Sequence, residues 1–502
     1  MRSTSLGCLL ALALTCSQPL HAGAQPSAEA GSATESGSGS DSETESGSVS
    51  VSGSETRSEP VPALPSPRWA DETTLPPIDE GFPARGDRVG PRPPPAPEEL
   101  EPRGLYAPRP LAAGRYVPGR GFELQTEDGD FGLALGAWGQ IEYRFDGRPG
   151  DDRHVLQIPR ARVRAAGHLF GTNHRYVMVL GFAPSELRRR PVDVVGLPDA
   201  PTGQFGDEVS LATADDVVQQ VPLLDLYFDF THFRDLSLRV GQFRLPYSKQ
   251  RMIPESARQF PQRALADREF ELDRDLGVML RSEDLGGLDL LRYSAGMFIG
   301  EGPNPDADSL GAGDPGFMYL GRVDLFPAGR FDDRVEADFA RTPYARMVLG
   351  AAFSLLQADA SSPHAVRFLG VQPAGAEVQP RVDFNVYNAT FDAMLKVSGF
   401  SSQAALYYRT FGGATGAREG LGLLLQAGYL FEPIALEPVA RYSLTRGSGT
   451  TSLPDVDELS VGLNYYLARN HLKLSLEYAR LAGVRGSGQG EDRLHTMLQV
   501  AL

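Results

Sequence analysis

Residues 471–478 read HLKLSLEY, an unbroken alternation of polar and apolar side chains. Successive side chains of a β-strand point to opposite faces, so this stretch predicts a strand with one apolar and one polar face. Residues 131–145 follow the same rule, with Leu135 and Ile141 on one face and Gln140 and Glu142 on the other. Strands of this kind can separate an apolar medium from water.

The alternation continues from about residue 121 to the last residue and predicts about sixteen strands. An even number of antiparallel strands can close into a transmembrane β-barrel, with lipid outside and water inside. The expected strands are 131–145, 155–170, 174–184, 223–233, 236–245, 275–282, 289–300, 316–326, 345–358, 381–398, 402–412, 420–431, 434–446, 457–468, 471–482 and 493–502.

The links between these strands alternate in length. Short turns such as 170–174 and 469–470 alternate with long links such as 185–222 and 246–274. A membrane barrel has short turns at its periplasmic rim and long external loops, whereas a soluble sandwich has no reason to alternate in this way. The link 327–344 breaks the rule, because it is long where a short turn is expected.

Residues 1–24 predict a secretory signal peptide, with a positive start, an apolar run and an A-x-A cleavage site. Both cysteines, Cys8 and Cys16, lie inside it, so the mature chain would have no disulfide. No later stretch has the roughly 18 uninterrupted apolar residues of a transmembrane helix.

Residues 25–120 are rich in Ser, Gly and Glu and then in Pro. This composition predicts a disordered tether that precedes the barrel at 121–502. Such a tether could contact periplasmic or cell-wall partners.

The chain has 502 residues, with 48 Lys+Arg against 64 Asp+Glu and a net charge of −16. This acidic balance argues against nucleic-acid binding, which needs a basic face. Lys249, Lys396 and Lys473 are the only lysines in the sequence, so nearly all of its cations are arginines. The barrel portion is itself acidic, with 38 Lys+Arg and 49 Asp+Glu in 121–502.

Arg160, Arg162 and Arg164 share one face of the predicted strand 155–170. Side chains two residues apart stand roughly 6.6–6.8 Å apart along a strand, so these arginines predict a ladder that attracts phosphate or carboxylate groups. By the same parity, Arg144 and Arg239 point inward. Alternatively, inward arginines pair with inward acids to give a neutral wall. The acids concerned are Glu142, Asp225, Asp229 and Glu437.

The link 246–274 is far longer than an ordinary turn, and loops of this length are usually functional. We expect it to fold into the barrel and narrow the channel. A surface lid or an oligomer contact is the alternative. Its basic candidates for a constriction are Lys249, Arg251, Arg258, Arg263 and Arg268.

The remaining motifs are weak. Arg188-Arg189-Arg190 could collect anions at an external mouth, but charge runs are more often solvated surface. Asp306-Ala307-Asp308 lacks the further ligands of a calcium site. No hydrolase, metalloprotease or phosphate-loop motif occurs, so the sequence predicts no enzyme, cofactor or metal.

Five stretches resemble, in their order, the phosphate-selective porin O and P family. They are 160–167 (RARVRAAG), 240–248 (VGQFRLPYS), 274–278 (RDLGV), 293–296 (YSAG) and 321–327 (GRVDLFP). The resemblance implies a sixteen-stranded, usually trimeric porin with an arginine ladder and an inward-folded loop, which takes up phosphate or polyphosphate. The chain departs from that family in its scarcity of lysine, which the best-known members use to attract anions. It also ends on Leu502 instead of an aromatic residue.

The sequence therefore predicts a Gram-negative outer-membrane porin for passive diffusion of small hydrophilic solutes, with a preference for anions such as phosphate or polyphosphate. Its expected partners are outer-membrane lipid, small anions and further copies of the chain in a homotrimer. Two alternatives stay open. One is a plugged barrel with a structural or anchoring role, and the other is a secreted, soluble all-β binding protein or enzyme.

Overall fold

The computed structural model describes residues 111, 114–117, 121–147, 152–184, 186, 188–191, 217–300, 302–304, 316–359, 383–412, 417–449, 451–483 and 490–502. The signal peptide, nearly all of the tether, and Asp306 and Asp308 lie outside these residues. Those predictions therefore stay predictions.

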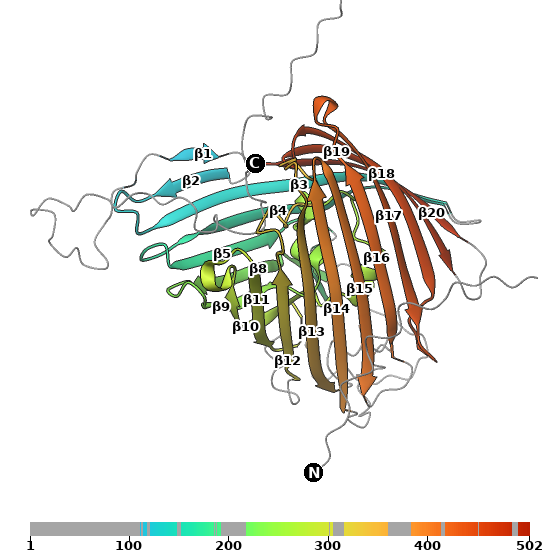
Figure 1. Cartoon of the computed structure of the whole chain (residues 1–502), viewed down its shortest axis with the longest axis horizontal. Coiled ribbons are helices and arrows are strands. Elements are labelled where there is room, and N and C mark those ends of the chain that lie inside the picture. Colours follow the sequence, from blue (N-terminus) through green and yellow to red (C-terminus); the bar gives the residue numbers. More distant parts are fainter. Residues whose placement is uncertain are drawn as a thin grey trace, which may run out of the picture. The chain divides into compact units, whose positions relative to one another are not determined.

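Sixteen antiparallel strands close into a barrel, in which each strand pairs with the next and β20 pairs back with β3 (Figure 1). The strands are β3 (Gly132–Gly147), β4 (Arg153–His168), β5 (His174–Gly181), β8 (Leu223–Phe230), β9 (Ser237–Arg244), β10 (Arg274–Ser282), β11 (Leu291–Phe298), β12 (Met318–Leu325), β13 (Arg346–Asp359), β14 (Asp383–Val397), β15 (Phe400–Gly412), β16 (Gly420–Tyr429), β17 (Leu436–Gly447), β18 (Val456–Ala468), β19 (Leu472–Gly483) and β20 (Glu491–Ala501). All the predicted strands are present, and the predicted fold class is confirmed.

The two faces of the wall differ as the alternation predicts. On β19, Leu474, Leu476 and Tyr478 are 42–45% exposed, whereas Lys473 and Glu477 are 1% exposed. A closed sheet leaves no unpaired edge, and an outward apolar face suits lipid. The chain is an outer-membrane barrel of the Gram-negative type, and its apolar outer face argues against the soluble alternative.

Short turns and long loops alternate around the barrel. The short-turn rim includes the 3-10 turns η4 (Leu285–Gly287) and η5 (Glu432–Ile434). Ser398 and Arg469 take positive φ angles of 49° and 48° there, which lets the chain reverse within a few residues. Helices in the described residues are all too short and too polar to cross a membrane.

Two short ribbons are absent from the sequence prediction. β1 (Arg115–Val117), which the sequence places in the tether, pairs with β2 (Gly121–Gln125), and β2 pairs with the start of β3. β20 reaches along β3 only as far as Trp138, so β2 covers the part of β3 that β20 leaves unpaired. The second ribbon joins β6 (Arg188–Pro191), which contains the arginine run, to β7 (Val217–Gln220).

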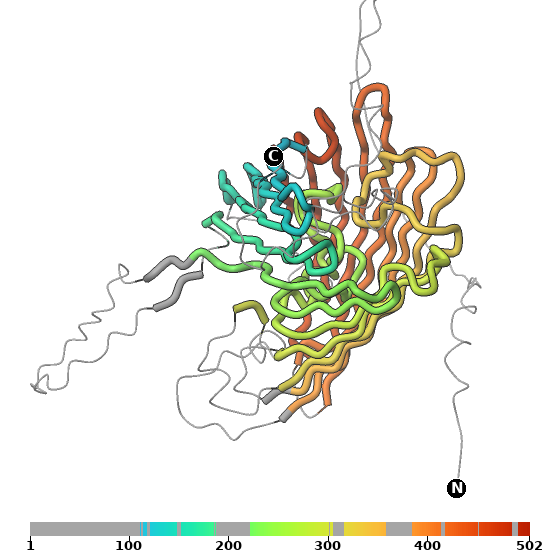
Figure 2. Tube along the Cα trace, turned by 90° about the vertical axis from the view of Figure 1, so that its left-hand side faces the viewer, coloured from blue at the N-terminus to red at the C-terminus, as the bar shows by residue number. Residues whose placement is uncertain are grey.

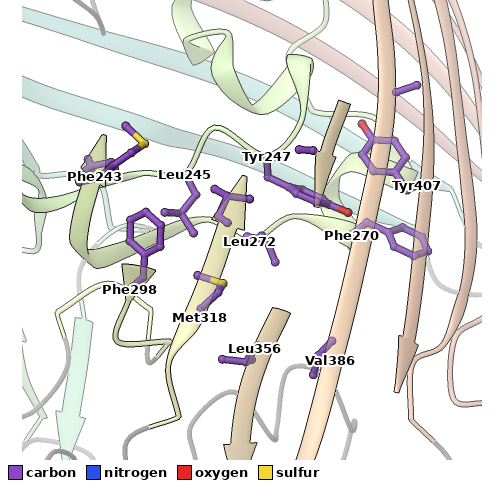
Figure 3. Packing of buried hydrophobic residues seen from close by; sticks show 14 of the residues in the cluster. Phe243, Leu245, Tyr247, Phe270, Leu272, Phe298, Met318, Leu356, Val386 and Tyr407 are labelled. Carbon is purple, nitrogen blue, oxygen red and sulfur yellow. The ribbon is translucent and has the colours of Figure 1, made fainter. Parts of the chain in front are cut away.

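Residues 245–273, here called the inner loop, lie within the ring of strands (Figure 2). Pro246 lies two residues after the end of β9 and has no N–H for the sheet ladder, so the chain leaves the wall there. The loop carries α1 (Lys249–Met252), η3 (Glu255–Ala257) and α2 (Leu265–Phe270). Phe270 stacks on Tyr407 of β15, with ring centroids 5.8 Å apart, inside a buried apolar cluster (Figure 3).

Residues 326–345, here called the rim segment, form the link between β12 and β13 that breaks the length rule. This link lies on the short-turn rim and also folds inward. Val335 and Ala337 are buried in one apolar cluster with Ile253 and Ala257 of the inner loop. The N–H of Glu336 donates to the carbonyl of Ala257 at 3.0 Å, so the two inward segments contact each other directly.

Candidate functional site

The ladder arginines lie on the inward face of β4, where Arg162 is 6% and Arg164 is 9% exposed. Arg160 donates to the side-chain oxygen of Gln140 at 2.8 Å and makes no ion pair with any residue that the structure describes. Arg162 instead donates to Glu255 of the inner loop at 2.7 Å. The ladder thus contains one arginine without an ion pair in the described residues and one that is paired.

Arg144 on β3 and Arg239 on β9 also face inward, and each has an acidic neighbour. The Nε of Arg144 lies 3.0 Å from Asp146, and the Nε of Arg239 lies 2.7 Å from Asp229. Arg239 also stacks over Tyr227, 3.9 Å from the ring centroid. These two arginines are largely neutralised.

The acids that the sequence singled out fall into two groups. Asp225 and Asp229 pair with arginines, Asp225 with Arg274 at 3.0 Å. Glu142 contacts His495 at 2.8 Å, and Glu437 accepts hydrogen bonds from Tyr466 and Gln259. The neutral-wall alternative therefore describes part of the lumen, around β8 to β10.

Wall side chains hold the inner loop through its backbone. The N–H groups of Leu265 and Ala266, at the start of α2, donate to Glu458 at 2.6 Å and Ser443 at 3.0 Å. The first N–H groups of a helix have no partner within it, so these wall acceptors both satisfy and fix α2. Ser248 caps α1 by accepting the N–H of Arg251 at 3.0 Å.

Two cations of the inner loop are tightly paired. The ammonium of Lys249 lies 2.5 Å from Asp333 of the rim segment. Arg251 pairs with Glu271 at 2.7 Å and with Asp273, and burial lowers the pKa of Arg251 to about 9. These residues join the inner loop to its surroundings.

The other three loop cations differ in their contacts. Arg263 lies 3.5 Å from Glu255 and 3.6 Å from Asp267. Arg263 donates to the backbone carbonyls of Gln250 and Ile253. Arg258 is 1% exposed and donates to the carbonyl of Pro261, while its Nε and Nη1 have no hydrogen-bond partner in the described residues. Burial and then the neighbouring Arg263 lower the pKa of Arg258 well below its usual value. The third, Arg268, makes no ion pair with the part of the chain that is described.

All three lysines are buried and hold inward segments in place. Besides Lys249, Lys396 of β14 donates to three carbonyls of the rim segment, at 2.6–3.0 Å. Lys473 of β19 donates to the carbonyl of Arg258 at 2.6 Å. With exposures of 1–5%, none is placed to collect anions, and Lys249 is a structural residue instead of a free cation of the constriction.

A cavity of about 310 Å³, here called the ladder cavity, lies between β4 and the inner loop. Six arginines and four carboxylates line it: Arg160, Arg162, Arg251, Arg263, Arg268 and Arg274, with Glu186, Glu255, Glu271 and Asp273. The cavity therefore has an excess of positive charge even though the whole barrel is acidic. It unites five of the candidates that the sequence named, namely Arg160 and Arg162 of the ladder with Arg251, Arg263 and Arg268 of the inner loop.

A second cavity of about 20 Å³, here called the rim cavity, lies between β9–β11 and the rim segment. Its charged lining is Arg239, Arg244, Arg281, Arg292, Arg334 and Glu283. Glu283 pairs with Arg334 at 3.0 Å and with Arg281. Burial raises the pKa of Glu283, but the nearby arginines outweigh it and lower the pKa below its usual range.

Glu255 lines the ladder cavity and contacts Arg244, which lines the rim cavity. Its Oε2 accepts from Arg162 at 2.7 Å and from Arg244 at 2.8 Å, and its Oε1 lies 3.5 Å from Arg263. Burial raises the pKa of Glu255, yet the three guanidiniums outweigh burial and hold the pKa well below its usual range. Glu255 thus stays a carboxylate at neutral pH.

Sequence reasoning missed Glu255 and most of the rim cavity. Strand parity could have found Arg281 and Arg292, which face inward on β10 and β11. Arg244 lies five residues after the inward Arg239, and this odd spacing would place its side chain on the outer face. Arg244 faces inward all the same, because it ends β9 where the chain turns into the barrel. Arg334 lies in a link without a strand period, which gives no signal of side-chain direction.

No protein-family model matches the chain, and no curated protein matches it. Among solved structures, it is similar to an anion-selective porin from Comamonas acidovorans, with 12% identity and a TM-score of 0.47, over 74% of this chain and 100% of that one. It is also similar to OprB of Pseudomonas putida, with 10% identity and a TM-score of 0.46, and the match covers 75% of this chain and 95% of that one. It is likewise similar to the trimer form of OmpT, an outer membrane protein of Vibrio cholerae, with 10% identity and a TM-score of 0.44. That match covers 73% of this chain and 99% of the other. These likenesses are of barrel fold, at identities too low to extend to solute or partner.

Proposed function

We propose that this barrel is an outer-membrane porin through which small hydrophilic anions diffuse passively. The observation that carries the proposal is the ladder cavity, in which six arginines face four carboxylates. A cavity with low-dielectric walls and an excess of one sign of charge concentrates ions of the opposite sign. Arginine forks also match the oxygens of phosphate and carboxylate.

The proposed route runs from the ladder cavity to the rim cavity past Arg244 and Arg274. Elsewhere the inner loop packs against the wall, with α1 on β14 and α2 on β15–β17. Phosphate and polyphosphate, which the family resemblance implies, are the first solutes to try. Homotrimer formation, proposed on the same resemblance, can be checked by unheated SDS electrophoresis and by mass measurement in detergent.

Reversal potentials across planar bilayers in asymmetric KCl test the anion preference. Arg160 and Arg268 are the arginines of the ladder cavity without an ion pair in the described residues, so the double change to Gln removes two positive charges and breaks no ion pair there. We expect the wild type to prefer chloride and this variant to lose that preference. Arg480→Gln is the control, because Arg480 is exposed and pairs with Asp492 away from both cavities. A cation-selective wild type, or an unchanged double variant, would contradict the proposal.

A plugged barrel with a structural or anchoring role is the second candidate. The observation in its favour is the volume of the rim cavity, about 20 Å³, which is close to the space one water needs. In that case the inner loop and the rim segment act as a permanent plug. Single-channel recording separates the two, since a plugged barrel stays silent in folded, detergent-purified protein.

A further inference from the structure

The carboxylate of Glu255 has an unusual set of neighbours. Arg162 from β4, Arg244 from β9 and Arg263 from the inner loop all approach it, and the Glu255 side chain is 6% exposed. Three separate parts of the fold therefore direct cations at a single pair of oxygens. A single arginine would be enough if the contact served only to stabilise the loop.

Arg162 has a second acidic partner, Glu186 at 2.6 Å, and Arg263 lies 3.6 Å from Asp267, but further guanidiniums stand close by. Arg258 is buried close to Arg263 and Arg160, and two of its nitrogens have no hydrogen-bond partner in the described residues. Arg160 contributes a further guanidinium that is bound only to the amide of Gln140 there. A group of guanidiniums around one carboxylate is the environment that binds an oxyanion such as phosphate.

The position of Glu255 is as informative as its contacts. Glu255 lines the ladder cavity, and its partner Arg244 lines the rim cavity. The charged contact between them therefore links the linings of the two cavities, on the proposed route. An anion that follows this route meets the carboxylate before it reaches Arg244.

We propose that the carboxylate of Glu255 is a tethered anion that occupies the oxyanion-binding site of the channel, so that a permeating phosphate or carboxylate must displace it. This inference rests on the proposed anion channel and deepens it. Glu255 keeps the site from binding one anion so tightly that it blocks, because conduction requires ions to leave as readily as they enter. Glu255 thus sets how strongly the channel retains oxyanions.

Inorganic phosphate, added to full-length protein that conducts chloride in planar bilayers, tests this. Glu255→Gln keeps the shape of the side chain but removes the negative charge that faces the three guanidiniums, so phosphate should block chloride current at about tenfold lower concentration, the effect of about one charge-assisted hydrogen bond. Glu269→Gln is the matched control. Glu269 lies on α2 of the same loop but pairs with Arg418, at 2.5 Å, outside the ladder cavity. Its replacement should leave the half-blocking concentration unchanged.

A second variant guards against a folding defect in Glu255→Gln. Glu255→Asp keeps the charge and withdraws the carboxylate by one methylene, so it should give a smaller shift in the same direction. Equal half-blocking concentrations for wild type, Glu255→Gln and Glu269→Gln would overturn the tethered anion, yet leave the anion channel standing if chloride selectivity persists. A folded wild type and a folded Glu255→Gln variant that are both silent would overturn the two together.

Discussion

Replacing Lys396 by Met should release the rim segment from the barrel wall. The Lys396 side chain is 5% exposed, and its ammonium donates to the carbonyls of Asp332, Val335 and Ala337 at 2.9, 2.6 and 3.0 Å. Methionine fills a similar volume but has no donor. Three carbonyls of the segment would therefore lose their partner at once.

The size of the effect follows from those bonds. A hydrogen bond from a charged donor contributes about 1.5–3 kcal/mol, so the three represent at least about 4 kcal/mol before dehydration of the ammonium is subtracted. If dehydration offsets half of this, about 2 kcal/mol still favours the docked segment. The undocked population should then rise about 30-fold, because each 1.4 kcal/mol is a factor of ten.

Limited trypsin digestion in detergent measures that population. Arg330, Arg334 and Arg341 are cleavage sites within the segment, and their cleavage rate follows the undocked fraction when redocking is fast. We expect cleavage there to be about 30-fold faster in the variant, by the same free-energy arithmetic. Lys473→Met is the control, because Lys473 is equally buried but holds the inner loop. Cleavage of the Lys396 variant at the wild-type rate, or equally accelerated cleavage in both variants, would refute the proposal that Lys396 anchors the rim segment.

Three other outcomes are expected. Gly167→Val should abolish the heat-modifiable folded band on SDS gels, because a Cβ there would lie 1.9 Å from the carbonyl oxygen of Gly132, whereas Gly321→Val, with no atom within 4 Å, should keep that band. Leu476→Arg places a charge on the lipid-facing side of β19 and should lower the unfolding free energy in lipid by about 2–4 kcal/mol in a urea titration, unlike Leu288→Arg at the rim. Reversal potentials should stay constant from pH 8 to pH 5, because burial raises the pKa of Glu255 but three arginines hold it well below its usual range. The stability from that cluster is complete above the unfolded pKa of about 4.3, and is lost only as the pH falls through the lowered folded pKa.

The strands were predictable because each obeys a local rule. A period of two assigns every wall residue to lipid or to lumen, as Leu474 and Lys473 show, and needs no knowledge of the partner strand. The rule weakens where both faces meet protein. Gln242, near the end of β9, is 5% exposed because it donates to the carbonyls of Leu223 and Leu224, so burial there no longer separates the two faces.

The partners of the inward charges were not predictable, because they depend on register and on the path of the two inward links. A register shift in the pairing of β3 with β4, between Gln140 and Glu142, places Arg160 opposite Gln140 and Gln157 opposite Glu142. Strand period alone cannot place such an irregularity. The approach of Glu255 to Arg162, 93 residues away in sequence, requires the folded inner loop.

An acidic barrel can still favour anions, because the field in a narrow cavity depends on the nearest charges and not on their total. Several lumen carboxylates are already committed to strong partners away from the proposed route. Asp392 is bound by Arg322 at 2.7 Å, Asp333 by Arg292 at 2.6 Å, and Glu477 by Arg441 at 2.7 Å. Paired charges of opposite sign cancel within a few ångströms, so these acids contribute little at the ladder cavity. We therefore expect the arginines without such partners, and not the net charge of the chain, to decide which ions enter the proposed channel.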